Sequence, residues 1–542
     1  MQSTRALQRR TPARPLQSLF VLPALIFLLS FAASPTARPE CRDGCDSSTG
    51  NTFQGEEALR NNTVNSNFNT ALGYFALTAN TGGGYNTATG SLALGSNTTG
   101  VQNTAVGALA LDINTTGSNN TAAGMAALNY NTTGSDNTAI GMEALQLNTT
   151  GSSDSALGSS ALRSNTSGFG NTAAGYDALF SNTTGNQNTA GGAFALYSSS
   201  TGNNNTAYGY SSLEANTSGV SNTATGAFAL ASNGTGNYNT ATGYLALWNN
   251  TSGGYNTSYG YNALGNSTSG SQNAANGATA LYNNTTGGNN TADGYATLYH
   301  NTTGGSNTAV GTNALGTNTT GGNNIALGDS AGINLTTGAN NIDIGNKGVL
   351  GEANTIRVGK KGTQTATYIA GIGGTTVATG IAVLIDNNGR LGTTTSSARF
   401  KENIRPMNQA SEAILSLQPV TFRYKKELDP DGIPQFGLVA EEVAKVDPEL
   451  VARDEEGKPY TVRYDAVNAM LLNEFLKEHH TVQKQDATIN ELKSTVARQE
   501  KEFLSAIAQQ QKQIGALSTN LHKVSAQLET TRPAPRMVAN DP

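Results

Sequence analysis

Residues 103–119 read NTAVGALALDINTTGSN, and residues 120–136 repeat the pattern as NTAAGMAALNYNTTGSD. Variants of the motif Asn-Thr-Ala-x-Gly begin every 17 residues from Asn69 to Asn341, without an insertion. Asp154 is the one replacement of the first asparagine in seventeen copies. A fixed period of this kind is typical of a solenoid, because each turn must stack on the turn before it. The repeat therefore predicts a parallel β-solenoid.

Two further positions of the repeat are nearly constant. The glycine four residues after each start is present in every copy, so the array spans residues 69–345. Leucine recurs eight residues after the start, and we expect this leucine and the alanine of the motif to face inward. Stacked Asn and Thr side chains can form hydrogen-bonded ladders. One leucine per turn is a thin core, so we expect several chains to pack around a shared axis, as a rod of about 80 Å.

Tyrosine forms a further row, five residues after the repeat start. One interpretation is a stacking surface for glycans, and the other is packing at turn corners or between chains. The threonine rows are explained by strand propensity without an ice-binding face. The row contains Tyr74, Tyr176, Tyr210, Tyr244, Tyr261 and Tyr295.

The charge pattern argues against several functions. The chain has a formal net charge of −5, and Arg163 is the one Lys or Arg between residues 61 and 345, so nucleic acid is not an expected partner. The array has one histidine, His300, and neither paired carboxylates nor metal-ligand spacing. We therefore expect no metal, no cofactor and no catalysis on an external substrate.

The N-terminus has the pattern of a secretory signal. Four arginines lie between residues 5 and 14, an apolar stretch runs from Leu19 to Ala33, and small residues precede a cleavage site after Ser34. The alternative is an uncleaved anchor, for which fifteen apolar residues are short. We expect a signal peptide at residues 1–34 and a secreted or cell-surface protein, with no transmembrane domain after its removal.

Cys41 and Cys45 are the two cysteines of the chain. They are too few for a disulfide framework, and their spacing does not indicate a metal site. A local disulfide or a link between chains is expected in an oxidising compartment.

A helix is expected beyond Asp465, because apolar residues recur there at helical spacing. Heptad-like spacing over this length favours a coiled coil, and the isoleucines at 489, 507 and 514 are compatible with a trimer. We place the coiled coil at residues 481–531.

Ser396 and Lys401 lie five residues apart, where the chain becomes charged. A lysine that has lost its proton can act as base for a serine nucleophile, and this requires desolvation or a nearby positive charge such as Arg399. Residues five apart are about 140° apart around a helix, so a turn must bring the pair together. We predict Ser396 and Lys401 as catalytic residues of a cut in cis, with Ser397 as a rival nucleophile.

The segment SSARFKENI, residues 396–404, resembles the endosialidase-type intramolecular chaperone, a self-cleaving Ser/Lys peptidase at the C-termini of phage tail fibres and related bacterial fibres. That family's pattern is Ser-Asp-x-Arg-x-Lys, which Ser396, Arg399 and Lys401 match. Ser397 stands where the family usually has aspartate, which leaves the efficiency of cleavage open.

Further segments follow in the order of that family. They are LQPVTFRY at residues 417–424, GLVAEEV at 437–443, with Glu441 where the family often has glutamine, PELV at 448–451, and Tyr464. The resemblance covers residues 396–480 and implies a domain that aligns three chains. The repeats, best at 324–328 and 341–345, resemble the left-handed parallel β-roll heads of trimeric autotransporter adhesins.

Together these observations predict an exported homotrimeric fibre, mainly β, whose α+β chaperone domain directs assembly and cuts itself off. The alternative is an adhesin for glycans or another cell-surface ligand, with a permanently attached, cleavage-dead trimerisation domain. The remaining predicted segments are an N-terminal linker at 35–68, a β-rich neck at 346–395, the chaperone and auto-peptidase domain at 396–480, and a disordered tail at 532–542.

Overall fold

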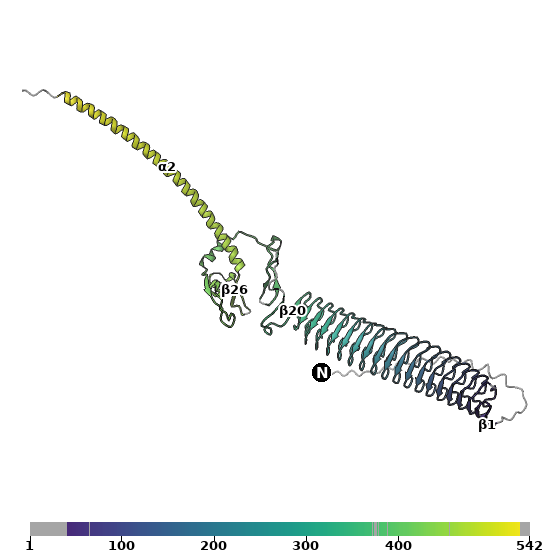
Figure 1. Cartoon of the computed structure of the whole chain (residues 1–542). Coiled ribbons are helices and arrows are strands. Elements are labelled where there is room, and N and C mark those ends of the chain that lie inside the picture. The colour runs from purple at the N-terminus through teal and green to yellow at the C-terminus, as the bar shows by residue number, and fades with distance from the viewer. Residues whose placement is uncertain are drawn as a thin grey trace, which may run out of the picture. The chain divides into compact units, whose positions relative to one another are not determined.

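The computed structural model describes residues 41–531, except for 64, 371, 373–376, 378, 387 and 455. The chain divides into two compact units, with the boundary between Thr367 and Tyr368. The first unit contains a stack of short strands, and the second contains a small folded region and a long helix (Figure 1). The predicted signal peptide and the predicted tail lie outside the described residues.

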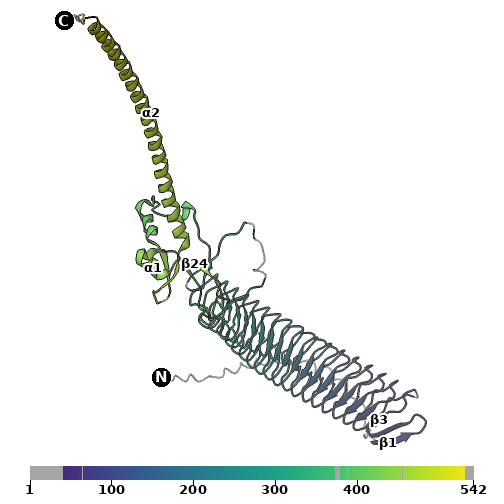
Figure 2. The same ribbon diagram turned by 60° about the vertical axis from the view of Figure 1, so that its left-hand side comes forward.

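The first unit is a parallel β-solenoid, as the repeat predicts, and its turns stack side by side (Figure 2). Each strand pairs with the next one along the chain in strict register, so that Thr104 lies beside Thr121 and Ala105 beside Ala122. The strands are β1 (Cys41–Asp46), β2 (Asn51–Glu56), β3 (Thr70–Leu72), β4 (Thr87–Thr89), β5 (Thr104–Val106), β6 (Thr121–Ala123), β7 (Thr138–Ile140), β8 (Ser155–Leu157), β9 (Thr172–Ala174), β10 (Thr189–Gly191), β11 (Thr206–Tyr208), β12 (Thr223–Thr225), β13 (Thr240–Thr242), β14 (Thr257–Tyr259), β15 (Ala274–Asn276), β16 (Thr291–Asp293), β17 (Thr308–Val310), β18 (Ile325–Leu327), β19 (Ile342–Ile344) and β20 (Ile356–Val358).

The solenoid extends beyond the predicted array at both ends. At the N-terminal end β2 adds a turn, and β1 pairs antiparallel with β2 and covers that edge of the sheet. Cys41 and Cys45 both lie in β1, where residues four apart are separated by about 13 Å. A disulfide spans at most about 7 Å between Cα atoms, so strand β1 favours the predicted link between chains over the predicted local disulfide, and both stay predictions.

The core of each turn closes within one chain. In the turn around β5, Ala105, Ala110 and Leu111 are all fully buried, and the same three positions are buried in almost every turn. The inward alanine and leucine are therefore confirmed, while the second alanine was missed. Because one chain fills its own core, the thin-core argument for a shared axis is wrong.

Two rows of buried asparagines form ladders through the solenoid. In the first row, the backbone N–H of Asn103 donates to Oδ1 of Asn86 at 2.9 Å, and its Nδ2 donates to the carbonyl of Gly117 at 2.9 Å. In the second row, Nδ2 of Asn114 donates to Oδ1 of Asn97 at 2.7 Å. Buried polar groups are costly unless they are hydrogen-bonded, and here neighbouring turns satisfy most of the asparagines, with Oδ1 of Asn182, Asn250 and Asn318 as exceptions. The predicted asparagine ladders are confirmed.

Backbone conformation explains the constant glycine. Gly175 has φ of 145°, and a Cβ atom there would lie 2.5 Å from the carbonyl oxygen of Gly192 in the next turn. The buried leucines also have positive φ, 51° at Leu111. A left-handed residue with a side chain costs about 1–2 kcal/mol, and full burial of a leucine offsets this by about 2 kcal/mol.

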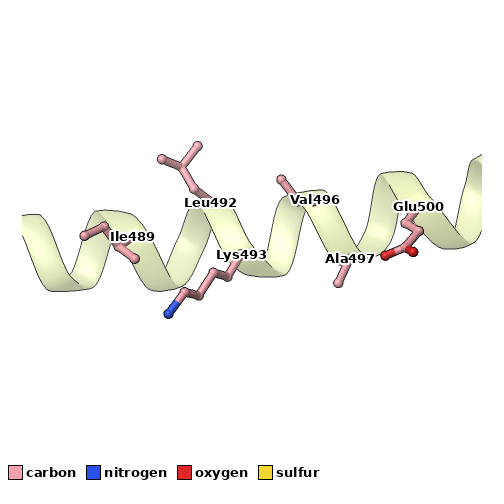
Figure 3. Close-up of a pocket in the computed structure, with 6 residues that line it drawn as sticks. All are labelled: Ile489, Leu492, Lys493, Val496, Ala497 and Glu500. Carbon is pink, nitrogen blue, oxygen red and sulfur yellow. The ribbon is translucent and has the colours of Figure 1, made fainter.

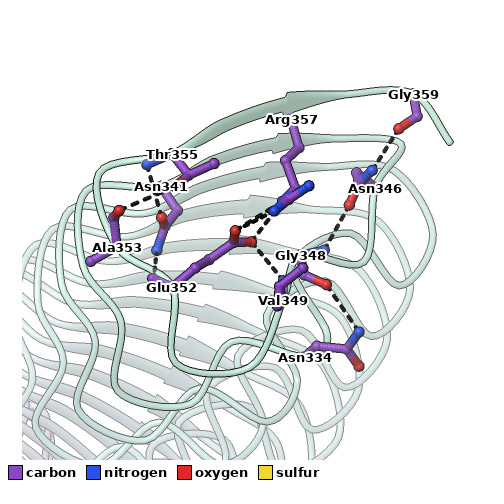
Figure 4. A network of polar contacts seen from close by, with 10 residues as sticks. All are labelled: Asn334, Asn341, Asn346, Gly348, Val349, Glu352, Ala353, Thr355, Arg357 and Gly359. Carbon is purple, nitrogen blue, oxygen red and sulfur yellow. Dashed lines mark hydrogen bonds and ion pairs between the residues drawn. The ribbon is translucent and has the colours of Figure 1, made fainter. Parts of the chain in front are cut away.

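The C-terminal end of the solenoid has a polar closure. Its last turn is 14 residues long, because Ile342 pairs with Ile356, so the period fails where the sequence indicates. Arg357 binds Glu352 there through two nitrogens, at 2.7 and 2.9 Å (Figure 4). Asp343 takes the inward position that alanine holds elsewhere, and burial raises its pKa to about 6.

The second unit is small apart from one helix. Its buried core consists of Val443, Leu450, Val451, Val462 and Met470. The predicted neck has only short strands in its described residues, of which β20 belongs to the solenoid. The elements of this unit are β21 (Leu384–Ile385), β22 (Leu391–Gly392), η1 (Ala398–Phe400), η2 (Asn408–Ser416), β23 (Val420–Phe422), β24 (Gln435–Gly437), α1 (Ala440–Val446), η3 (Pro448–Leu450), β25 (Val451–Arg453), β26 (Pro459–Val462) and α2 (Tyr464–Thr530).

Candidate functional site

The predicted catalytic pair flanks a short turn. Ser396 follows β22, the 3-10 helix η1 lies between the two residues, and the backbone N–H of Lys401 donates to the carbonyl of Ala398 at 3.1 Å. Turn geometry thus replaces the regular helix that would hold the pair apart. Both side chains are exposed, and within the described part of the chain no hydrogen bond joins them.

The surroundings of Lys401 are open to water in the single chain. Arg399, the predicted source of positive charge, lies with its guanidinium carbon 4.6 Å from the ring centre of Phe400, which is itself 59% exposed. A lysine base needs surroundings that remove water from its ammonium group. The exposed turn around Lys401 does not provide such surroundings within the described part of one chain.

A serine–lysine contact that the sequence did not indicate lies in the folded region. The buried hydroxyl of Ser411 in η2 donates to the carboxylate of Glu474 and accepts hydrogen bonds from Nδ2 of Asn473 at 2.6 Å and Nζ of Lys477 at 3.4 Å. The hydrogen bond between Lys477 and Glu474 raises the pKa of the lysine and lowers that of the carboxyl. Lys477 is therefore charged and unsuited as a base, and the cluster fastens η2 to α2.

Residues of the motifs that follow Ser396 position the start of the long helix. The hydroxyl of Tyr464, the first residue of α2, accepts a hydrogen bond from the backbone N–H of Leu438 at 3.1 Å. A Cβ atom at Gly437 would lie 2.8 Å from that hydroxyl oxygen, so glycine at this position leaves room for the hydroxyl. GLVAEEV and Tyr464, which are 20 or more residues apart, thus meet at one contact.

The folded region leaves an apolar groove open. The groove has a volume of about 530 Å³, and the ring of Phe436 at its edge is 82% exposed. Such an exposed apolar surface is typical of an interface. The groove is lined by residues of η2, β23, β24 and α2 and of the segments beside them: Ile414, Leu417, Pro419, Val420, Thr421, Phe436, Gly437, Leu438, Val467 and Leu471.

The long helix also carries an exposed apolar stripe. Ile489, Leu492 and Val496 are 46–59% exposed and follow one another along α2 (Figure 3). Met470 is the one buried residue of the helix in the described part of the chain. The predicted helix is confirmed over its whole length, and its pairing with other helices stays a prediction.

The comparisons concern the region just described. The family model described as the chaperone of endosialidase matches residues 396–452, so the match begins at Ser396 and includes Lys401, β23, β24 and α1. No curated protein matches the chain. Among the described residues there is no helix with the length and hydropathy of a membrane span, and no group of side chains suited to a metal ion. The chain therefore combines a β-solenoid repeat array with a following region that is similar to the chaperone of endosialidase, and this combination fits a tail-fibre-like protein.

Proposed function

We propose that the protein is an exported fibre whose C-terminal region aligns three chains and then cuts itself off, with Ser396 as nucleophile and Lys401 as base. The observation that carries the proposal is the order of the parts. A closed solenoid is followed by the matched region beginning at Ser396 and then by a 67-residue helix with an exposed apolar stripe. Export rests on the signal pattern of residues 1–34.

Fibre assembly poses a register problem that such a region would solve. Every turn of the solenoid presents nearly the same strand and the same two asparagine ladders, so chains that pair along the rod can slip by whole turns at little cost. If the α2 helices of three chains associate, they fix the register of the chains at one end of the rod. The exposed groove around Phe436 offers a second surface for contact between the chains.

The proposed cut uses the turn around η1. The hydroxyl oxygen of Ser396 attacks the carbonyl carbon of the peptide bond beside it, and Nζ of Lys401 takes the hydroxyl proton and passes it to the leaving nitrogen. Water then hydrolyses the ester. Because Lys401 is exposed in the single chain, the cut would wait until neighbouring chains cover the turn. Loss of the template would leave the assembled rod kinetically trapped.

The test compares the wild type with Ser396→Ala and Lys401→Ala on a denaturing gel and by intact mass. We expect a wild-type fragment of the last 146 or 147 residues, absent from both variants. Ser397→Ala is the matched control, and it should retain the fragment. Full-length chain in every sample would refute the peptidase and leave a permanently attached trimerisation domain.

Charge in the helix stripe should abolish both assembly and cleavage. Leu492→Asp places three carboxylates in the proposed seam, where unpaired charge is strongly unfavourable, so we expect at least about a tenfold loss of trimer and of fragment. Light scattering and gel densitometry measure the two. Ser494→Asp, about 200° around the helix from Leu492, is the control. Cleavage by a monomeric Leu492→Asp protein would contradict the coupling.

A second candidate function is binding to a surface ligand. Exposed tyrosines of the solenoid favour it, because Tyr176, Tyr210 and Tyr261 are each at least half exposed. This function requires the rod but not the cut.

A further inference from the structure

Six aromatic rings form a continuous ridge on the solenoid. They are Tyr176, Phe194, Tyr210, Phe228, Tyr244 and Tyr261, and consecutive ring centres are 5.3–6.2 Å apart. The tyrosines occupy the predicted row, and the phenylalanines occupy the next position of the repeat. The ridge is thus an aromatic surface that crosses six turns.

The ridge is ordered before any partner arrives. Tyr210 and Tyr244 are 50% and 48% exposed, whereas Phe194 and Phe228 are only partly exposed and contact the tyrosine rings edge-on. Rings that neighbours already hold lose little freedom on binding. Aromatic rings of this kind combine an apolar face with a polar hydroxyl at the edge.

The chemistry around the ridge selects an uncharged partner. From residue 164 to residue 292, Asp177 and Glu214 are the charged residues, both acidic, and the remaining polar side chains are mainly Asn, Thr and Ser. Partners of high charge are recognised by clusters of opposite charge, which this stretch lacks. Amide and hydroxyl groups instead suit a partner rich in hydroxyl groups.

The ridge is local, which argues against a seam between chains. The first asparagine row, with Asp154 in one copy, and the buried core continue along the repeat array, whereas Ser199 and Ser267 interrupt the second row. In the tyrosine row the preceding turns have Ala108, Met125, Met142 and Ser159, and a later turn has Ala278, so the row is not aromatic throughout. A chain–chain seam would need contacts throughout, whereas a ligand needs one site.

We infer that this ridge binds a neutral, extended polysaccharide, whose sugar rings stack on the tyrosines. Tyr176, Tyr210 and Tyr244 recur every second turn, about 9.6 Å apart, which suits a linear polymer lying along the rod. The inference rests on the ligand-binding form of the proposed function and is independent of self-cleavage.

The test uses the full-length protein with Ser396→Ala, so that binding and cleavage are separated. Pull-down on microcrystalline cellulose and on chitin is compared with soluble alginate, an anionic polymer. Trp248, the one tryptophan of the chain, lies four residues after Tyr244, so its fluorescence can follow titration with cellohexaose or chitohexaose.

We expect retention on at least one neutral polymer and a loss of about tenfold or more in Tyr210→Ala/Tyr244→Ala. The Phe double variant at the same positions should bind, because it keeps the rings. Tyr238→Ala/Tyr255→Ala is the matched control, since those stacked, exposed rings occupy another row.

Three outcomes would overturn the inference. They are absence of retention on both neutral polymers, retention on alginate alone, and equal loss in the control variant. A change of oligomeric state in Tyr210→Ala/Tyr244→Ala, measured by light scattering, would assign the ridge to chain–chain contact. Loss of the fragment in Ser396→Ala without retention on either neutral polymer would leave the cleavage proposal standing by itself.

Discussion

Gly175→Ala should destabilise the solenoid by more than about 4 kcal/mol, which is exceptional for a single methyl group. The new Cβ atom would lie 2.5 Å from the carbonyl oxygen and 2.6 Å from the carbonyl carbon of Gly192. These atoms belong to the backbone of the next turn and cannot move without opening the stack. The φ of 145° is also a conformation that residues with side chains avoid.

Gly170→Asn is the matched control, five residues away. Gly170 has φ of 66°, and a Cβ atom there would meet only Gln187 Cγ at 3.6 Å. The equivalent positions in neighbouring turns hold Ser153 and Gln187 at φ of 61° and 56°, so asparagine should be tolerated. Thermal unfolding followed by circular dichroism compares the two variants. Equal melting temperatures would show that the turns can separate without cost.

Asp154→Asn should stabilise the solenoid, by up to about 4 kcal/mol above pH 7. Asp154 replaces asparagine in the first ladder and is fully buried, and burial raises its pKa from 3.8 to about 7. Its carboxylate accepts hydrogen bonds from Asn171 and Asn165. In other turns the first asparagine also donates to the glycine carbonyl fourteen residues on, which is Gly168 here. The substitution would restore that donor.

The effect of Asp154→Asn should depend on pH. Because the folded pKa is raised, protonated Asp154 favours the folded state at low pH, and this contribution is lost as pH rises from about 4 through about 7. The stability difference between variant and wild type should therefore grow over that window and stay level above it. Chemical denaturation at pH 4, 6 and 8 measures it.

Asp293→Asn is the control for this prediction, since the exposed Asp293 of β16 carries the same charge outside the core. It should change stability by less than about 0.5 kcal/mol. A pH-independent difference for Asp154→Asn would contradict the role assigned to burial. Asp112 and Asp343, whose pKa values burial raises to about 6, are present in both proteins. They should leave Asp154→Asn with a pH dependence of stability that is smaller than that of the wild type.

The repeat predicts most of the solenoid because its period of 17 residues is the number of residues from one strand to the strand stacked on it. The inward alanine and leucine and the asparagine ladder follow from that. The positive φ at the leucines was not predictable, since propensity disfavours it and only burial at Leu111 outweighs the cost. The closed core was also missed, because the second alanine, such as Ala110, lies outside the motif.

The candidate site was predictable in sequence order but not in space. The turn between Ser396 and Lys401 could be predicted, because residues five apart face different sides of a helix, but no hydrogen bond joins the two side chains in the described part of the chain. The hydrogen-bonded cluster at Ser411 depends on Asn473 and Lys477, which are more than 60 residues away and share no spacing with it. Tertiary packing of η2 on α2 alone brings them together.

The strict register of the turns gives the rod a length that can change in fixed steps. Because every turn hydrogen-bonds only its neighbours through equivalent positions, removal or duplication of 17 consecutive residues joins two turns that already match. A number of residues that is not a multiple of 17 would break both asparagine ladders at the junction. Recombination between such similar segments of a gene can therefore shorten or lengthen this fibre in increments of about 4.8 Å without a new core having to evolve.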